Sequence, residues 1–373
     1  MPIRPALLVA WSALASIGIA LGGRSIDLAV YLRAAADVLA GRDPNITPAG
    51  ELPWLYPPAA ALPFAPLTWL PFDLAAVVLA LASLAALART LHLVLGRLGH
   101  TSPTATLVAV ALAIAVEPVT STLGHGQVNL VIAWLVAEGF LGGHRWLIGV
   151  AAGIKLTPLV FLLPLVLRRD WRGAALTLAG FAGTVAVGWL VAPTASVTYW
   201  GGLFFDPRDK IGIAFATNQS ITGALWRIAG EGGVPLLGIA LSLAVLALAV
   251  VAQRRHPDDD VLGLWVTGIA GLLVSPISWT HHWVWLLPAV AWLWVHGRRR
   301  FAIAWGVLMV GWVTWWFPDA GGRAFPLDLL AVAVQNSWAI VAVLTLVRCA
   351  TWRGPSPAAT PGGVEPRALE AVR

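Results

Sequence analysis

An acidic residue, Asp27, lies directly after the first apolar segment of the chain, where that segment should leave a lipid bilayer. A carboxylate at such a position can take the proton of a hydroxyl group as the oxygen attacks an electrophilic carbon. Two adjacent histidines, His281 and His282, occur far along the chain in the stretch SPISWTHHW. A histidine can donate a hydrogen bond to an anion or carry a positive charge near neutral pH. These residues predict a general base and an anion-binding group, which the fold must bring together.

Other polar residues in largely apolar surroundings are candidates for substrate binding. Lys155, in the stretch GIKLTP, is costly to place within an apolar span, so we expect it to bind an anionic lipid head group. Its alternative role is to extend to the membrane surface. Asn218 and Gln219, in the stretch NQS, are expected to hydrogen-bond a sugar or a phosphate, the alternative being a cap on the following helix. The remaining expected substrate contacts are aromatic: Tyr31, Tyr56 and Trp279.

The three residues of the expected reaction centre also have purely structural interpretations. Asp27 would stand in the first turn of a helix, where the helix dipole favours a negative charge. His281 and His282 lie among several tryptophans and can belong to an aromatic belt at the membrane surface. Because adjacent residues of a helix point about 100° apart, we expect only one of the two histidines to face a cavity.

The composition indicates that most of this chain lies in a lipid bilayer and not in water. Of its 373 residues 58% are hydrophobic and 11% are charged, which excludes an ordinary soluble domain. Apolar segments long enough for membrane-crossing helices recur along almost the whole length. The single cysteine, Cys349, leaves no internal disulfide and no cysteine-based metal cluster. The net charge of +6 comes from short basic clusters between apolar segments, so it indicates membrane topology and not nucleic-acid binding.

The positive-inside rule orients the predicted spans. Basic clusters at 168–172, 254–256 and 298–300 stand at span ends and should be cytoplasmic. We therefore predict an all-α polytopic membrane protein with about twelve spans and both termini in the cytoplasm. The predicted spans are 6–22, 57–70, 73–96, 104–120, 128–142, 146–167, 174–191, 235–252, 260–276, 282–296, 301–317 and 327–348.

Some features fit the twelve-span count poorly. Segment 57–70 is short and contains four prolines, and Arg97 and Arg145 fall on the external face. In this count Gln127 and Asn129 are cytoplasmic, so we interpret them as a polar contact between helices. That interpretation reverses if segment 57–70 does not cross the membrane. No role is assigned to three further histidines, His92, His100 and His125.

Residues 1–353 are predicted to form one transmembrane domain. Its first external loop, at about 23–56, is long enough to hold a helix of its own. Ser25 can cap the start of that helix and Gly41 can end it. The segment 354–373 is rich in proline, glycine and alanine and is expected to be a disordered cytoplasmic tail.

The order of several short motifs resembles glycosyltransferase family 87, within the GT-C superfamily of membrane enzymes. The motifs are D-x-x-x-Y from Asp27, Y-P-P from Tyr56, G-x-G-Q-x-N at 124–129, K-x-x-P from Lys155, N-Q-S at 218–220 and H-H-W at 281–283. The chain is most similar to the actinobacterial members that use polyprenyl-phosphate-mannose to make phosphatidylinositol mannosides and lipomannan by α-(1→2) linkage. The resemblance implies a GT-C fold in the cell membrane, with an extracytoplasmic active site and Asp27 as the general base.

The implied reaction is consistent with what the sequence contains. A single displacement would invert the anomeric carbon, and the leaving lipid phosphate would need charge stabilisation by His281 or His282 more than it would need a proton. The chain has no glycine-rich phosphate loop, and the acids of DPRD at 206–209 are poorly spaced for a metal pair. We therefore expect no cofactor and no metal. The expected partners are the lipid-linked mannose donor, a glycolipid acceptor and membrane lipids, with no nucleic acid.

Three other functions remain open at the level of sequence. A polyprenyl-phosphate-arabinose-dependent arabinosyltransferase would use the same base and the same phosphate chemistry. A lipid or glycolipid transporter could also have twelve spans, but carriers usually show two similar halves, and this chain does not. A non-catalytic assembly factor for envelope glycolipids is the third possibility, and the presence of Asp27 argues against it.

Overall fold

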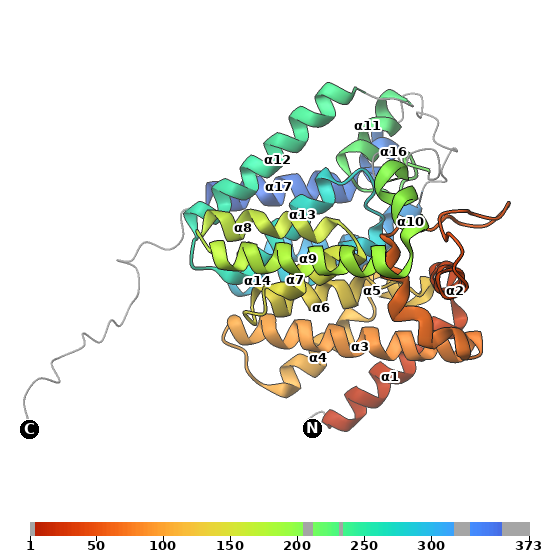
Figure 1. Ribbon diagram of the computed structural model, residues 1–373. Helices are drawn as coiled ribbons and strands as arrows, with labels where there is room; N and C mark the ends of the chain where they lie inside the picture. The colour runs from red at the N-terminus through yellow and green to blue at the C-terminus, as the bar shows by residue number, and fades with distance from the viewer. Residues whose placement is uncertain (1–3, 204–211, 231–233, 317–328, 353–373) are drawn as a thin grey trace, which may run out of the picture.

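The computed structural model describes residues 4–203, 212–230, 234–316 and 329–352, and its regular elements are all helical (Figure 1). They are α1 (Pro5–Gly22), α2 (Ile26–Leu39), η1 (Pro58–Trp69), α3 (Phe72–Arg97), α4 (Pro103–Ala113), α5 (Glu117–His125), α6 (Asn129–Phe140), α7 (Trp146–Ile154), η2 (Thr157–Phe161), α8 (Leu162–Leu167), α9 (Trp171–Val191), α10 (Pro193–Thr198), η3 (Tyr199–Leu203), α11 (Ile221–Ala229), α12 (Pro235–Arg255), α13 (Asp260–Val274), η5 (Thr280–Trp285), α14 (Leu286–Val295), α15 (Arg299–Gly311), η6 (Val313–Trp315), α16 (Leu329–Gln335) and α17 (Ser337–Thr351). Among the described residues the only β pairing is an isolated bridge between Asn218 and Trp279. The predicted all-α class is confirmed.

Four helices, α1, α3, α9 and α12, are long and apolar enough to cross a membrane, and α4 with α5 makes a fifth if that pair, bent by 73°, is one span. Three of them, α1, α9 and α12, bury only 17% of the most apolar window inside the protein. Figure 1 shows α1 and α12 at opposite edges of the bundle. Their exposed apolar faces need a lipid environment, because water would not cover them favourably. The chain is a multi-pass membrane protein.

Several of the predicted spans are not continuous α-helices, and two of them bear on the topology. Segment 57–70 forms the 3₁₀ helix η1, which contains Pro63 and Pro66. Segment 146–167 is divided into α7, η2 and α8, and the backbone is extended at Lys155, with φ −147° and ψ 127°. Irregular backbone within a membrane protein is tolerated where it is buried in protein or lines a cavity. Both breaks are therefore expected to lie at a functional part of the molecule.

Ion pairs contradict the predicted alternation of faces. Arg97 lies 2.6 Å from Asp260, and Arg145 lies 3.0 Å from Asp170. The twelve-span count placed both arginines outside and both acids inside. Partners in direct contact cannot lie on opposite faces of a bilayer, so this part of the prediction is wrong. The physical reason is that segments 57–70 and 146–167 were treated as complete crossings.

The helix predicted in the first external loop is present as α2. Gly41 adopts φ +69° just beyond its end, as expected for a residue that terminates a helix. Ser25 stands at the N-cap but makes no side-chain cap; instead its hydroxyl donates to the carbonyl of Ala20 at 3.3 Å. That prediction is corrected because Ser25 has φ 41° and is part of a tight turn between α1 and α2. The predicted tail, 354–373, lies outside the described residues.

Candidate active site

A cavity of about 700 Å³ lies where the ends of several helices meet. Its walls come from α2 and the loop that follows it, the break after α5, the break after α7, and the segment between α13 and η5. Figure 1 shows α2 at the same end of the bundle as α10. Of the candidates from the sequence, the lining residues are Asp27, Tyr31, Tyr56, Lys155, Trp279, His281 and His282.

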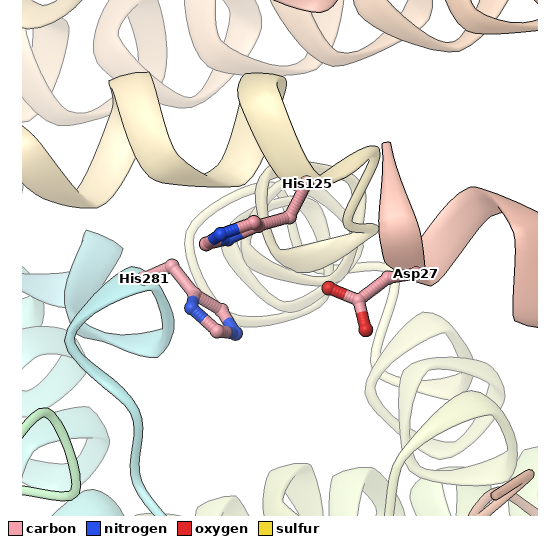
Figure 2. Close-up of side chains that lie close together, drawn as sticks. All are labelled: Asp27, His125 and His281. Atoms are coloured by element: carbon pink, nitrogen blue, oxygen red, sulfur yellow. The ribbon is translucent and has the colours of Figure 1, made fainter. Parts of the chain in front are cut away.

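Close contact between the start of α2 and the end of α5 positions Asp27. The backbone N–H of Ser25 donates to the carbonyl of Gly124 at 3.0 Å. A Cβ atom on Gly23 would stand 2.2 Å from that same carbonyl oxygen, so only glycine permits the approach. The result is that the Asp27 carboxylate faces His125, the last residue of α5 (Figure 2).

The Asp27 carboxylate is partly buried in this cavity, and α2 is not one of the span candidates. Burial raises its pKa above the ordinary value, while a hydrogen bond from Gln127 and the nearby charges of His125 and Lys155 oppose part of that rise. A higher proton affinity makes a carboxylate a stronger base. The environment therefore suits a residue that must accept a proton.

Two histidines complete a cluster around Asp27. One oxygen or nitrogen atom each from Asp27, His125 and His281 lies within 4.8 Å of the other two, and Figure 2 shows the side chains pointing toward a common centre. His125 Nδ1 and His281 Nε2 are buried and have no hydrogen-bond partner among the described residues. Burial holds the pKa of His281 well below its usual range, so the ring is neutral at physiological pH and keeps a free lone pair.

Lys155 and His282 form a second basic group beside this cluster. Lys155 Nζ lies 2.8 Å from His282 Nε2 and 5.8 Å from the centre of the Tyr56 ring. The extended backbone at the end of α7 directs the lysine side chain into the cavity. At this separation the two groups share protons and carry one positive charge more readily than two, because like charges so close repel.

A tyrosine pair links α2 and the loop that follows it to Gln127. The hydroxyl of Tyr31 donates to Gln127 Oε1 at 2.6 Å and lies 3.0 Å from the hydroxyl of Tyr56. The sequence analysis placed Gln127 on the opposite side of the membrane from these tyrosines, and the contact shows that placement to be wrong. The count treated segment 57–70 as a crossing span, whereas the segment forms the 3₁₀ helix η1, which is not among the helices long and apolar enough to cross a membrane.

Asn129 is also on the same side as Asp27, and it holds the histidine segment in place. Asn129 Nδ2 and Thr122 Oγ1 each donate to the carbonyl oxygen of His281 at 3.0 Å. Thr122 lies within α5 and Asn129 is the first residue of α6, so these two helices fix the backbone from which the His281 ring projects. The GHGQVN motif therefore contributes to the site through Gln127 and Asn129 as well as through its glycines.

Residues 54–276 match the model of glycosyltransferase family 87. The chain belongs to glycosyltransferase family 87. The resemblance seen in the short motifs is confirmed by this match, which covers more than half of the chain, and by similarity to curated proteins.

Two relatives of this family 87 protein are similar over most of its length. A polyprenol-phosphate-mannose-dependent alpha-(1-2)-phosphatidylinositol pentamannoside mannosyltransferase of Mycolicibacterium smegmatis is 38% identical over 309 residues, or 77% of this chain and 74% of the relative. A polyprenol-phosphate-mannose-dependent alpha-(1-2)-phosphatidylinositol mannoside mannosyltransferase of Mycobacterium tuberculosis is 35% identical over 358 residues, or 84% of this chain and 83% of the relative. No solved structure matches the chain significantly.

In this family 87 protein Asn218 and Gln219 do not line the cavity. Asn218 Oδ1 accepts from the backbone N–H of Ser278 at 2.8 Å, and Asn218 Nδ2 donates to the carbonyl of Pro276 at 3.1 Å. Gln219 Oε1 accepts from the backbone N–H of Trp338 at 3.1 Å. Both side chains are fully buried. Backbone groups use the hydrogen-bonding capacity of both side chains, so the structure gives no support to the expected contact with sugar or phosphate. The Asn218 side chain braces the loop that carries Trp279, and the Gln219 side chain holds the start of α17.

Both histidines of the family 87 site line the cavity, although we expected only one to do so. Their rings are 4.6 Å apart and nearly perpendicular. The difference arises because His281 and His282 lie at the start of the 3₁₀ helix η5, after a stretch of extended backbone. Two side chains can therefore meet one cavity from different directions: His281 beside Asp27, and His282 beside Lys155.

The cavity residues that were not expected from the sequence include His125, Gln127 and Trp315. The signal for the first two was present, since the GHGQVN motif contains both. Trp315 had no distinguishing signal in a chain with 21 tryptophans. Its indole Nε1 donates to buried Glu117 at 3.1 Å, which orients the ring at the edge of the cavity.

Proposed function

We propose that this family 87 protein transfers mannose from polyprenyl-phosphate-mannose to a phosphatidylinositol mannoside or lipomannan-type acceptor, through an α-(1→2) linkage. The names of the relatives support the donor, the linkage and the phosphatidylinositol mannoside class of acceptor. The observation that carries the proposal is the presence in one cavity of a carboxylate, Asp27, and a basic pair, Lys155 and His282.

Asp27 acts as the general base in this mechanism. The acceptor hydroxyl lies against the carboxylate, and its oxygen attacks the anomeric carbon of mannose while its proton passes to Asp27. The bond between the anomeric carbon and the phosphate oxygen breaks, and its electron pair leaves with the phosphate. Attack from the face opposite the leaving group inverts the anomeric centre, so that a β-linked donor gives an α-linked product.

Lys155 and His282 receive the leaving phosphate. Negative charge on the bridging oxygen grows as the bond to mannose breaks, and a positively charged donor pair stabilises it most at that stage. A proton can pass between the two nitrogens of the pair as the phosphate oxygen gains negative charge. This needs no movement of the backbone, since the nitrogens are already 2.8 Å apart. Tyr31, Tyr56 and Trp279 line the same cavity and are suited to contact the sugar rings.

The protein is placed in the plasma membrane with this cavity on the extracytoplasmic side. Support comes from the basic clusters at 168–172 and 254–256, which do not line the cavity and are cytoplasmic under the positive-inside rule. A GT-C arrangement follows in which segments 57–70 and 146–167 enter the membrane without crossing it. The remaining ten predicted spans then place Arg97 and Arg145 in the cytoplasm, in agreement with their ion pairs.

The test is transfer by the purified protein. Detergent-solubilised enzyme is incubated with radiolabelled polyprenyl-phosphate-mannose and a phosphatidylinositol tetramannoside, and lipids are separated by thin-layer chromatography. The expected product is a labelled glycolipid that an exo-α-(1→2)-mannosidase converts back to the acceptor. A labelled product from polyprenyl-phosphate-arabinose alone would instead indicate an arabinosyltransferase. Donor that crosses proteoliposome membranes without any product would indicate a transporter.

A further inference from the structure

We propose that Asp27, His125 and His281 bind a divalent transition-metal ion of the zinc type, and that the bound ion blocks the base. One ligand atom of each residue lies within 4.8 Å of the others. The ion would add to this cavity a function that the sequence did not indicate, since we expected no metal there. The blocking effect rests on the proposed role of Asp27, whereas binding of the ion does not.

The two imidazole rings have the separation that a shared ion requires. Rings bound through nitrogen to one tetrahedral ion, at about 2.1 Å each, have centres about 5 Å apart. The ring centres of His125 and His281 are 5.2 Å apart, and the planes are inclined by 67°. Ligand atoms on one such ion are about 3.3 Å apart. Side-chain rotations that move the ligand atoms by about 1 Å would therefore complete the site.

The unpartnered nitrogens are the second observation that points to a ligand. His125 Nδ1 and His281 Nε2 are buried, and among the described residues neither has a hydrogen-bond partner. A buried polar atom without a partner is costly, so such atoms usually meet water, substrate or an ion. Figure 2 shows the two rings and the Asp27 carboxylate directed toward the same space.

Neighbouring side chains provide the outer support that metal ligands need. Gln127 hydrogen-bonds the Asp27 carboxylate, and Asn129 and Thr122 fix the backbone carbonyl of His281. Such contacts orient ligands and typically change affinity by about 10- to 100-fold. The fourth position of a tetrahedral ion would face the cavity, where it would hold water.

The donor set selects the class of ion. Two imidazole nitrogens and one carboxylate oxygen favour zinc, and its substitutes cobalt and nickel, over magnesium or calcium, which prefer oxygen ligands. The nearby charge of Lys155 opposes any cation, and this further disfavours ions that are held by charge alone. An ion on Asp27 would occupy the oxygen that takes the proton, so zinc should inhibit transfer in competition with the acceptor.

Binding is tested without reference to activity. Protein purified without a polyhistidine tag is stripped with chelator and titrated with Co²⁺, whose visible absorption is intense when it is four-coordinate. We expect saturable binding, displaced by Zn²⁺. His125→Gln should weaken the apparent affinity by more than about 100-fold, since a ligand is lost. His144→Gln, which changes an exposed histidine in the loop before α7, should bind as the wild type does.

A second measurement uses the wild type alone. Zn²⁺ should protect His281 from carbethoxylation, detected by mass spectrometry, while His144 stays reactive. The site would be overturned by the absence of a Co²⁺ spectrum or by equal spectra for the wild type and His125→Gln. Equal modification of His281 with and without Zn²⁺ would also overturn it. Transfer that stops in chelator and returns with Zn²⁺ would overturn the blocking role. If Co²⁺ binds but no condition gives product, the proposed function fails and the metal site stands.

Discussion

Lys155 and His282 project from breaks in two different helical segments, and their nitrogens, Nζ and Nε2, lie 2.8 Å apart. This contact joins the end of α7 to the start of η5, which are 127 residues apart in the chain. It also brings together the two basic groups of the proposed phosphate site.

Loss of either member of this pair should reduce turnover. His282→Phe keeps bulk but cannot donate, and we expect transfer to fall by about 10²- to 10³-fold, as for other groups that stabilise a developing negative charge. His282→Gln should recover part of the rate. Lys155→Met should have a similar effect, and the double variant should be little worse than either single one, because coupled residues are not additive. Equal rates for His282→Phe and the wild type would mean that the phosphate is bound elsewhere.

Asp27→Asn should abolish transfer while the protein still binds donor. Asparagine is nearly the same size but cannot accept the proton, and loss of a general base typically costs about 10²- to 10⁴-fold in rate. The wild-type rate should also fall at low pH with an apparent pKa above the ordinary value of about 3.9, since burial raises the pKa of Asp27. Initial rates against pH, together with equilibrium binding of labelled donor, check both statements. Near-normal activity of the variant would leave Asp27 with only a helix-dipole role.

The same variant should be more stable than the wild type at neutral pH. The folded-state pKa of Asp27 is raised, so its contribution to stability is fully present below its unfolded pKa and is lost as pH rises through the folded pKa. Asparagine does not titrate. The melting temperature of Asp27→Asn should therefore exceed that of the wild type by an amount that grows as pH rises above the ordinary pKa of about 3.9. A difference that shrinks over this range would contradict the assignment.

Gly126→Ala should disable the site by moving α2. Gly126 has φ +69°, and a Cβ atom there would lie 2.7 Å from the Cβ of Leu28, next to Asp27. Gly143 offers a matched control, because it has φ +85° but nothing within 4 Å of an added Cβ. Gly143→Ala should cost about 1 kcal/mol of stability from backbone strain alone. Gly126→Ala should lower both the melting temperature and the activity further than Gly143→Ala does. Equal effects of the two changes would show that the contact with Leu28 does not matter.

Cysteine labelling distinguishes the two topologies. In a Cys349→Ser background, Ile46→Cys should react with a membrane-impermeant thiol reagent in intact cells, since it is 74% exposed in the loop that we propose to be extracytoplasmic. His100→Cys, exposed just after α3, should react only after the membrane is broken. The twelve-span count places residue 100 outside and expects the opposite. Arg300→Cys should behave as cytoplasmic in both.

The sequence by itself determined the class of the protein and much of its chemistry. Its composition required a lipid environment, and the order of motifs from Asp27 to the histidine pair identified the family before any geometry was known. Residue type was sufficient for Asp27, Lys155 and His282, because a charged or titratable side chain in apolar surroundings is rarely without a function. Asp27, Lys155 and His282 all line the cavity.

Only the tertiary structure decided which faces and which side chains meet. Hydropathy measures how apolar a segment is, and it cannot tell a complete crossing from a helix that breaks halfway, as segment 146–167 does at Lys155. One misplaced crossing then moved Gln127 to the wrong side of the membrane. The sequence favoured Asn218 as a cavity residue and assigned no role to His125, and the structure reverses this. Whether a polar group is available to substrate depends on which backbone groups already bind it. Asn218 binds Pro276 and Ser278, whereas the ring of His125 faces Asp27.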